Sequence, residues 1–305
     1  MVVLGAGGFI GSRVVRAALA AGAAVTAVCP LQSWRLGGVD EPGLELVELE
    51  HPWWSLDAAP ALATVLDGAR ALCLLAYEAP GPGLDPEQHE RRVNLAGAVR
   101  IAKLAFARGV HVVFAGSADV YGAWHAQPVS EETEPAPVSP YAVVKLETEQ
   151  VLVEAAAQPP PGLLAVLRIS TVYGTGELGP RAIPSFVRAL IAGNPPVVHG
   201  DGSDVRDYVH VVDVAAAFCN AAARSTEGVL NVGSGEGRPT RQVLDDVAAA
   251  LGVVARPRLE PAARPPSRLV LDVSRARSRI GLAPSRSFDE ALVAEVEWLA
   301  ATFGS

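Results

Sequence analysis

Short apolar runs that alternate with helical patterns are the feature that most constrains this chain. At its start, apolar Met1–Leu4 precedes a helix-like stretch, Gly11–Ala21, and a second apolar run, Ala24–Val28. The alternation continues through Ala71–Leu75, Val93–Arg108, Val110–Ala115, Pro140–Ala156 and Leu163–Ile169. Continuously apolar strands separated by helices are typical of a parallel sheet that is covered on both faces. We therefore predict an α/β fold with a doubly wound parallel sheet.

A glycine-rich turn joins the first predicted strand to the first predicted helix. Gly5, Gly8 and Gly11 are spaced three apart in this turn. A tight strand-to-helix turn needs backbone without side chains, and the amides and dipole at a helix start attract a pyrophosphate. The alternative, a glycine-rich turn without a ligand, is disfavoured by the position of the motif at the N-terminal strand of an α/β chain. We predict a dinucleotide site here.

The second predicted strand lacks the acidic residue that usually holds the ribose of a dinucleotide. It ends at Cys29, which Pro30 follows. Arg35 lies shortly after and is placed to face a ribose phosphate, although a single loop arginine is more often only solvated. These residues alone leave the choice between NAD and NADP open.

Tyr141 and Lys145 form a candidate acid–base pair. They are four residues apart in SPYAVVK, so a helix places them on one face, one turn from each other. An ammonium beside a phenol favours the phenolate and lowers its pKa, which suits proton transfer near neutral pH. Ser117 ends the apolar strand of HVVFAGS, where its hydroxyl can bond a substrate oxygen beside Tyr141. The alternative for the Tyr141–Lys145 pair alone is an exposed helix without a catalytic role. The alternative for Ser117 alone is a serine that satisfies backbone groups in a turn.

Composition narrows the class of partners. The chain has 305 residues, 50% hydrophobic and 19% charged, and a net charge of -8 without any Lys/Arg run. Nucleic acid and anionic membranes are therefore not expected as partners. The cysteines are scattered, and no apolar segment resembles a secretion signal or a membrane span, so we predict a cytoplasmic protein. The histidines lack the spacing of metal ligands, so we predict no metal site. The cysteines are Cys29, Cys73 and Cys219.

Several ordered segments together resemble the extended short-chain dehydrogenase/reductase superfamily, specifically its NAD-dependent epimerase/dehydratase branch. The segments are GAGGFIGSRVV, RVNLAGAVRIAKLA, SADVYG, YAVVK, LRISTVYG, GDGSDVRDYVHVVDVAAA and LNVGSGEGRPTRQVLDDVAAALG. The resemblance covers nearly the whole chain. It implies a Rossmann domain, with NAD as cofactor and NADP as the alternative, and a nucleotide-diphosphate sugar as substrate.

The resemblance also implies roles for individual residues. The catalytic residues would be Ser117, Tyr141 and Lys145. Cofactor contacts would come from Gly5, Gly8, Phe9, Ile10, Gly11, Cys29, Arg35, Ala76, Asn94, Tyr141 and Lys145. Substrate contacts would come from Ser117, Thr171, Arg206 and Arg264, with both arginines on the diphosphate. The alternative for each arginine is a salt bridge within the protein.

The residues beside Ser117 separate the reactions of this branch. Ala118 cannot transfer a proton, which disfavours a 4,6-dehydratase, and Asp119 is shorter than the glutamate that a decarboxylase is expected to carry. An epimerase needs no additional acid–base pair, so we expect an NDP-hexose 4-epimerase, of the UDP-glucose type, that oxidises C4 transiently. The alternatives are an NADPH-dependent 4-ketoreductase of deoxysugars and a non-catalytic protein that binds the dinucleotide or sugar nucleotide.

The predicted organisation is a dinucleotide-binding domain at residues 1–172 and a smaller, irregular α/β substrate domain at residues 173–305. Segments within about 205–232 are expected to return to the first domain. The helix at Val93–Arg108 carries a wide apolar band, which with the helix at Pro140–Ala156 suits a homodimer interface. The alternative is a monomer that buries this band in its own core.

Overall fold

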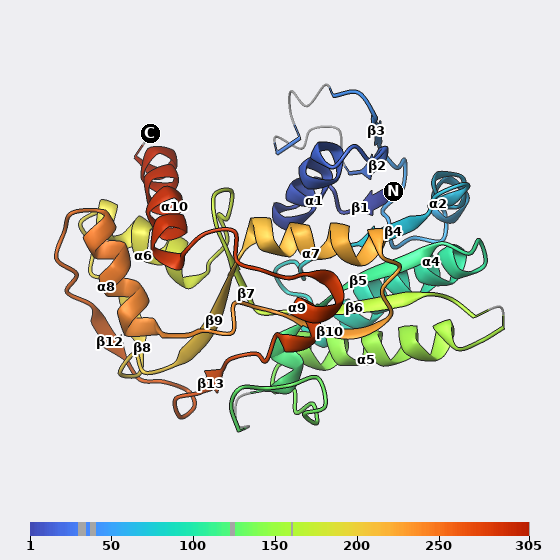
Figure 1. The fold of residues 1–305 in the computed structure, drawn as a ribbon. Coiled ribbons are helices and arrows are strands. Elements are labelled where there is room, and N and C mark those ends of the chain that lie inside the picture. The colour runs from blue at the N-terminus through green and yellow to red at the C-terminus, as the bar shows by residue number, and fades with distance from the viewer. Residues whose placement is uncertain (30–34, 37–40, 123–125, 160, 305) are drawn as a thin grey trace.

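A seven-stranded parallel sheet is the centre of the computed structural model, which describes residues 1–29, 35–36, 41–122, 126–159 and 161–304 (Figure 1). The sheet order is β10-β6-β5-β4-β1-β2-β3. The strands in chain order are β1 (Val2–Leu4), β2 (Val25–Val28), β3 (Leu44–Val47), β4 (Ala71–Leu74), β5 (His111–Ser117), β6 (Leu164–Ile169) and β10 (Gly228–Val232). The predicted doubly wound parallel sheet is confirmed, and β10 joins it from the later half of the chain.

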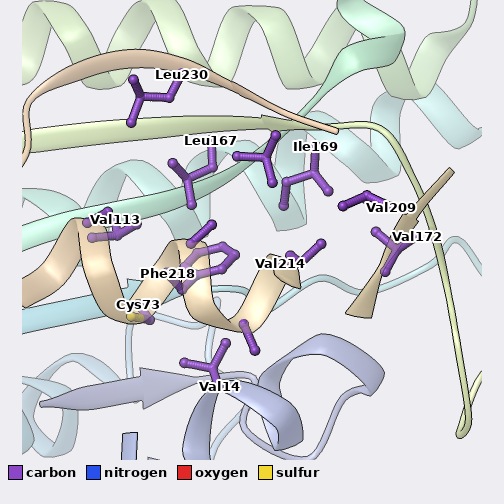
Figure 2. Close-up of a cluster of buried hydrophobic side chains, with 14 of the residues drawn as sticks. Val14, Cys73, Val113, Leu167, Ile169, Val172, Val209, Val214, Phe218 and Leu230 are labelled. Carbon is purple, nitrogen blue, oxygen red and sulfur yellow. The ribbon is translucent and has the colours of Figure 1, made fainter. Parts of the chain in front are cut away.

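Helices cover both faces of this sheet because its strands are apolar on both sides. One face packs against α1 (Phe9–Ala20), α7 (Val211–Ala223) and α9 (Ser274–Ile280), and the other against α2 (Ala59–Leu66), α4 (Ala96–Phe106) and α5 (Pro140–Ala156). Within β1, Val3 belongs to the first core, whereas Val2 and Leu4 belong to the second. Figure 2 shows the first core, where Phe218 of α7 lies among Cys73, Val113 and Leu167 from three strands.

Short helical segments link β4 to α4 and β5 to α5. They are α3 (Pro86–His89), a π-helix (Glu90–Leu95) and a 3₁₀ turn (Ala118–Tyr121). The π-helix runs directly into α4, so the helix predicted at Val93–Arg108 begins within a wider turn.

The strand order reverses between β1 and β4, where the chain crosses from one half of the sheet to the other. In doubly wound sheets, ligands bind outside the carboxyl ends of the strands at such a reversal. The glycine turn follows β1 and Ser117 ends β5, so both predicted sites lie at this edge.

The later part of the chain forms a second lobe with its own core. Its sheets contain β7 (Thr171–Tyr173), β8 (Val197–His199), β9 (Val205–His210), β11 (Gly237–Pro239), β12 (Arg258–Glu260) and β13 (Arg268–Leu269). Its helices α6 (Ala182–Ile191), α8 (Thr240–Ala250) and α10 (Phe288–Phe303) pack together at the end of the molecule away from α2 (Figure 1). This lobe is more regular than the sequence suggested.

Candidate active site

The turn after β1 forms a cradle of bare backbone. Gly5 has φ +91°, and a Cβ there would lie 2.7 Å from the Ala76 nitrogen. A Cβ on Gly11 would lie 2.1 Å from the Gly5 oxygen. Gly8 is the N-cap of α1 and offers no side-chain acceptor to the first amides of the helix. These amides therefore remain available to an anion, as a pyrophosphate site requires.

A groove of about 620 Å³ extends from this cradle across the ends of β2, β3 and β4. Gly5, Gly8, Cys29 and Ala76, four of the predicted cofactor residues, line it. Glu48 lines it too, directly after β3, and its charge together with burial raises the pKa of the Cys29 thiol. The carboxylate missing at Cys29 is therefore present one strand further along the sheet. The sequence analysis did not identify Glu48, although an acidic residue directly after a strand could have indicated it.

Arg35 does not line this groove. Its Nη2 donates to the Gly176 carbonyl at 3.0 Å, and it borders a separate cavity of about 240 Å³ with Arg13 and Arg16. The neighbouring Pro30 lies outside the described residues. The structure thus places Arg35 at this second cavity, and its role as a ribose-phosphate ligand stays a prediction.

Asn94 was expected near the cofactor, and the structure shows it organising the segment after β4. Its Nδ2 donates to the Glu78 carbonyl at 2.9 Å, and its Oδ1 accepts from the Glu78 amide at 2.9 Å. The paired bonds fix the backbone next to Ala76 and Tyr77, on the wall of the groove. Asn94 therefore does not line the groove itself but holds the backbone of Glu78, which does.

Ser117, Tyr141 and Lys145 line one cavity of about 430 Å³. Tyr141 follows Pro140 in the first turn of α5, which Ser139 caps by accepting from the Ala142 amide. Lys145 lies one turn later, and its Nζ donates to the Ala115 carbonyl at 2.9 Å. Strand β5 thus positions both Ser117 and the lysine. Leu75 and Tyr77 line this cavity as well as the groove, so the two spaces adjoin.

Burial is the largest influence on the pKa of both groups. It raises the pKa of Tyr141 to about 12, aided by the charge of Asp119 and opposed by a hydrogen bond from Ser117 and by Arg181. It lowers the pKa of Lys145 to about 8. Desolvation therefore outweighs the lowering of the phenol pKa that was expected from the ammonium.

The residues beside Ser117 match the pattern expected for an enzyme without a second acid–base pair. Ala118 is 1% exposed and contributes no proton-transfer group to the cavity. Asp119 lines the cavity near its exposed edge, and its amide donates to Ser117 Oγ at 3.2 Å.

The predicted substrate arginines converge in the second lobe. Arg206 Nη2 and Arg264 Nη1 donate to Ser267 Oγ at 2.9 and 2.6 Å, and Asp204 accepts from the same hydroxyl at 2.6 Å. Arg206 and Thr171 line the cavity, whereas Arg264 does not. Asp204 forms ion pairs with Arg206 and Arg264, at 3.9 and 3.3 Å, so the salt bridges considered as the alternative are present. Burial opposes the shift, but Ser267 and both arginines hold the pKa of Asp204 below its ordinary value. A diphosphate would have to replace Asp204 as the partner of these guanidinium groups.

In the described part of the chain, no three His, Cys, Asp or Glu side chains cluster in a way that could hold a metal ion. None of the helices in those same ranges is long and apolar enough to cross a membrane.

Comparisons with known proteins identify the family of the chain. A family model described as the NAD dependent epimerase/dehydratase family matches residues 1–233. A UDP-glucose 4-epimerase from Mycolicibacterium smegmatis is 32% identical, covering 97% of each chain. Another from Azospirillum brasilense is 30% identical and covers 93% of this chain and 87% of that protein. The solved structure of MoeE5 in complex with UDP-glucose and NAD matches with a TM-score of 0.82 and 30% identity, covering 99% and 98% of the two chains.

Proposed function

Because the chain belongs to the NAD-dependent epimerase/dehydratase family, we propose that it interconverts C4 epimers of a nucleotide-diphosphate hexose, with UDP-glucose as the reference substrate. One observation carries the choice of reaction. Ser117, Tyr141 and Lys145 share a cavity in which the next residue, Ala118, is small and buried. The cavity thus holds what C4 oxidation and its reversal need, without the extra acid–base pair that dehydration needs.

NAD is the cofactor. The turn fits a pyrophosphate because no side chain caps the first amides of α1, while the bare Gly5 and Gly11 let the turn and the helix pack closely on neighbouring backbone. Ile10 lines the catalytic cavity and Phe9 begins α1, so the first turn of this helix reaches from the groove toward Tyr141. Glu48 stands where ribose or adenine polar groups need an acceptor. When bound, the nicotinamide supplies the hydride acceptor and donor, together with a positive charge in its oxidised form.

The chain's own residues carry the proton. We assign Tyr141 Oη as the group that takes the proton of the C4 hydroxyl and later returns it. Ser117 Oγ hydrogen-bonds the same sugar oxygen and holds it beside the phenol. Because burial raises the pKa of Tyr141 to about 12, formation of the phenolate would need the positive charge of Lys145 and that of an oxidised nicotinamide.

The second lobe binds the nucleotide part of the substrate. Arg206 and Arg264 bind the diphosphate, which replaces Asp204 and Ser267 as their partner. Thr171 contacts the sugar from the cavity wall. Holding the diphosphate while leaving the sugar loosely enclosed allows the keto sugar to turn, which inversion at C4 requires.

The 4-ketoreductase alternative depended on NADPH and on the missing acid at Cys29. Arg35 lies outside the groove and Glu48 lies inside it, which favours NAD over a 2′-phosphate. A non-catalytic binding protein would not need three acid–base and hydrogen-bonding groups in one cavity. The epimerase therefore accounts for the most features.

The oligomeric state and the division at residues 172 and 173 stay predictions. In the structure, Ile101, Ala102 and Ala105 of α4 are buried within the subunit, while Leu95 and Val99 are half-buried. We propose that α4 and α5 form the interface of a homodimer, with α5 contributing exposed Val153. Light scattering of the purified protein tests this directly.

The proposed reaction is tested by mixing the purified protein with UDP-galactose or UDP-glucose and resolving the products by chromatography. We expect the same equilibrium mixture from either side, without net change in reduced nicotinamide. A stoichiometric consumption of NADPH with a 4-keto sugar nucleotide, and no epimer formation, would contradict the proposal.

A further inference from the structure

Aromatic rings enclose the ammonium of Lys145 on three sides. Its Nζ lies 5.0 Å from the centroid of the Phe114 ring, 5.6 Å from that of Tyr77 and 5.8 Å from that of Tyr141. The rings of Tyr77 and Tyr141 meet edge to face, with centroids 5.7 Å apart. Rings attract a cation but replace little of its lost hydration, so the charged form of Lys145 needs further support.

A buried carboxylate stands behind this group of rings. Glu90 is 3% exposed, and its Oε1 accepts a short hydrogen bond from the hydroxyl of Tyr77. Its Oε2 accepts from Asn94 Nδ2 at 2.9 Å. Both carboxylate oxygens are therefore bonded to neutral groups, and no arginine or lysine of the described residues forms an ion pair with Glu90. Its negative charge is left to act on the cavity.

The π-helix places Glu90 behind Tyr77, which itself lines the cavity. Glu90 opens the segment Glu90–Leu95, whose wider turns place Glu90 beside Asn94 on one side. Such turns occur often at functional sites. Asn94 is held in turn by Glu78, so the carboxylate has a fixed position relative to Tyr77.

We propose that Glu90 is a positioning residue that acts through Tyr77 to keep Lys145 protonated and in place beneath Tyr141. Tyr77 supplies the ring and the link to Glu90. It does not act as an acid or base, since burial and Glu90 raise its pKa well above the ordinary value and the hydroxyl already donates to Glu90. The proposal uses the role given to Lys145 in the proposed function but concerns the charge state of that lysine.

The charges around the cavity fix the sign of the effect. Burial lowers the pKa of Lys145 and Glu90 is the charge that raises it. For Tyr141, Asp119 and Arg181 are stronger influences, and Glu90 raises the pKa only weakly. The nearest acids on α5 are already paired, Glu149 with Arg168 and Glu147 with Arg91. Removing the charge of Glu90 should therefore lower the pKa of Lys145, and the accompanying change at Tyr141 is in the same direction.

The first test measures Lys145 itself and does not depend on turnover. The rate of reductive methylation of Lys145 in the cofactor-free protein is followed against pH by mass spectrometry. In Glu90→Gln, which keeps the shape and a hydrogen-bond acceptor, we expect the midpoint to fall by about one pH unit. Glu147→Gln is the matched control, because it removes an acid two residues from Lys145 that faces Arg91, and it should leave the midpoint unchanged.

The second test is the pH profile of epimerisation. The alkaline limb should begin at lower pH in Glu90→Gln, by the same interval as the methylation midpoint, and Glu90→Asp should restore most of it. Tyr77→Phe keeps the ring and the charge but loses the link, so a smaller shift in the same direction is expected. This variant also serves if circular dichroism shows Glu90→Gln unfolded.

The outcomes separate this proposal from the proposed function. An unchanged methylation midpoint in folded Glu90→Gln overturns the role of Glu90, and so does an equal shift in Glu147→Gln. A shifted midpoint in a protein without epimerase activity supports the role of Glu90 and counts against the proposed function alone.

Discussion

The cofactor groove and the sugar cavity meet at Leu75 and Tyr77, yet they are built in different ways. The groove begins at bare backbone, where Gly5, Gly8 and Gly11 let the turn after β1 and the start of α1 pack closely on neighbouring backbone. The cavity depends on side chains that come from both lobes and titrate under each other's influence. A motif in the sequence therefore defines the first region, whereas the second exists only once distant segments have come together.

The two regions should fail differently when changed, and the largest effect is expected in the cavity. In Tyr141→Phe, the group that moves the proton is lost while the ring remains. We expect kcat to fall by about 1000-fold, with NAD and UDP-glucose affinities within about threefold of the wild type. Steady-state kinetics and calorimetric titration check this. Retained turnover would show that another group moves the proton.

The backbone cradle should instead tolerate no added side chain. In Gly11→Ala, the new Cβ would meet the Gly5 carbonyl at 2.1 Å, and neither backbone segment can move freely. We expect a loss of about 3 kcal/mol in the free energy of unfolding and a loss of NAD binding. Gly81→Ala is the control, because its nearest contact would be an ordinary 3.8 Å to a leucine side chain. Equal melting temperatures for Gly11→Ala and Gly81→Ala would contradict the claim that the turn after β1 cannot accommodate a side chain.

The substrate end should affect binding more than chemistry. Arg206→Ala removes one of the two guanidinium groups that share Ser267. We expect KM for UDP-glucose to rise by about 10- to 50-fold with kcat nearly unchanged, because the diphosphate is bound alike before and during reaction. Arg241→Ala, on an exposed i,i+4 pair of α8, should change neither value. A drop in kcat alone would place Arg206 at the reacting centre.

The smallest expected effect concerns buried charge. In the larger lobe, Glu149 bonds Arg168 Nη2 at 2.5 Å, whereas Glu295 on α10 is 0% exposed and has no hydrogen-bond partner of good geometry within the described residues. Burial raises the pKa of Glu295 from 4.5 to about 8. The folded protein therefore binds the extra proton between these pH values, and its stability falls as pH rises across them.

Glu295→Gln should remove this dependence. Relative to the wild type, we expect the variant to be more stable at pH 8 than at pH 5, and the new amide, which is itself buried, should lower its stability equally at both pH values. Urea unfolding at both pH values measures the difference. An effect of the same size at both would show that shape, and not charge, sets the result.

The contrast also explains what could be predicted from the sequence. The strands β1, β2, β4, β5 and β6 and the helices α1, α4 and α5 were predicted, and the structure brings Ser117, Tyr141 and Lys145 into one cavity, as expected. Strand β3 was missed because it lies at the sheet edge and is half exposed, and Glu48 was missed with it. The helical core of the second lobe was missed because α6, α8 and α10 bury their apolar faces against one another across long sequence intervals.

Some features had no local signal at all. The sequence around Glu90 does not indicate a π-helix. The side chains of this segment form hydrogen bonds with Tyr77 and Glu78, which are distant in sequence and contact it only in the folded protein. The position of Arg35 likewise depends on a carbonyl at Gly176 in the other lobe. The pKa of Tyr141 could not be read from its neighbour Lys145, because burial in the folded cavity outweighs that charge.

The fate of the hydrogen on C4 tests the central claim most directly. UDP-glucose carrying deuterium at C4 is converted by the enzyme in ordinary water, and the UDP-galactose formed is analysed by NMR and mass spectrometry. Transient oxidation with return of the same hydride predicts that the product keeps the deuterium at C4. Loss of the label to solvent, or label that ends in released nicotinamide without epimer, would contradict the account.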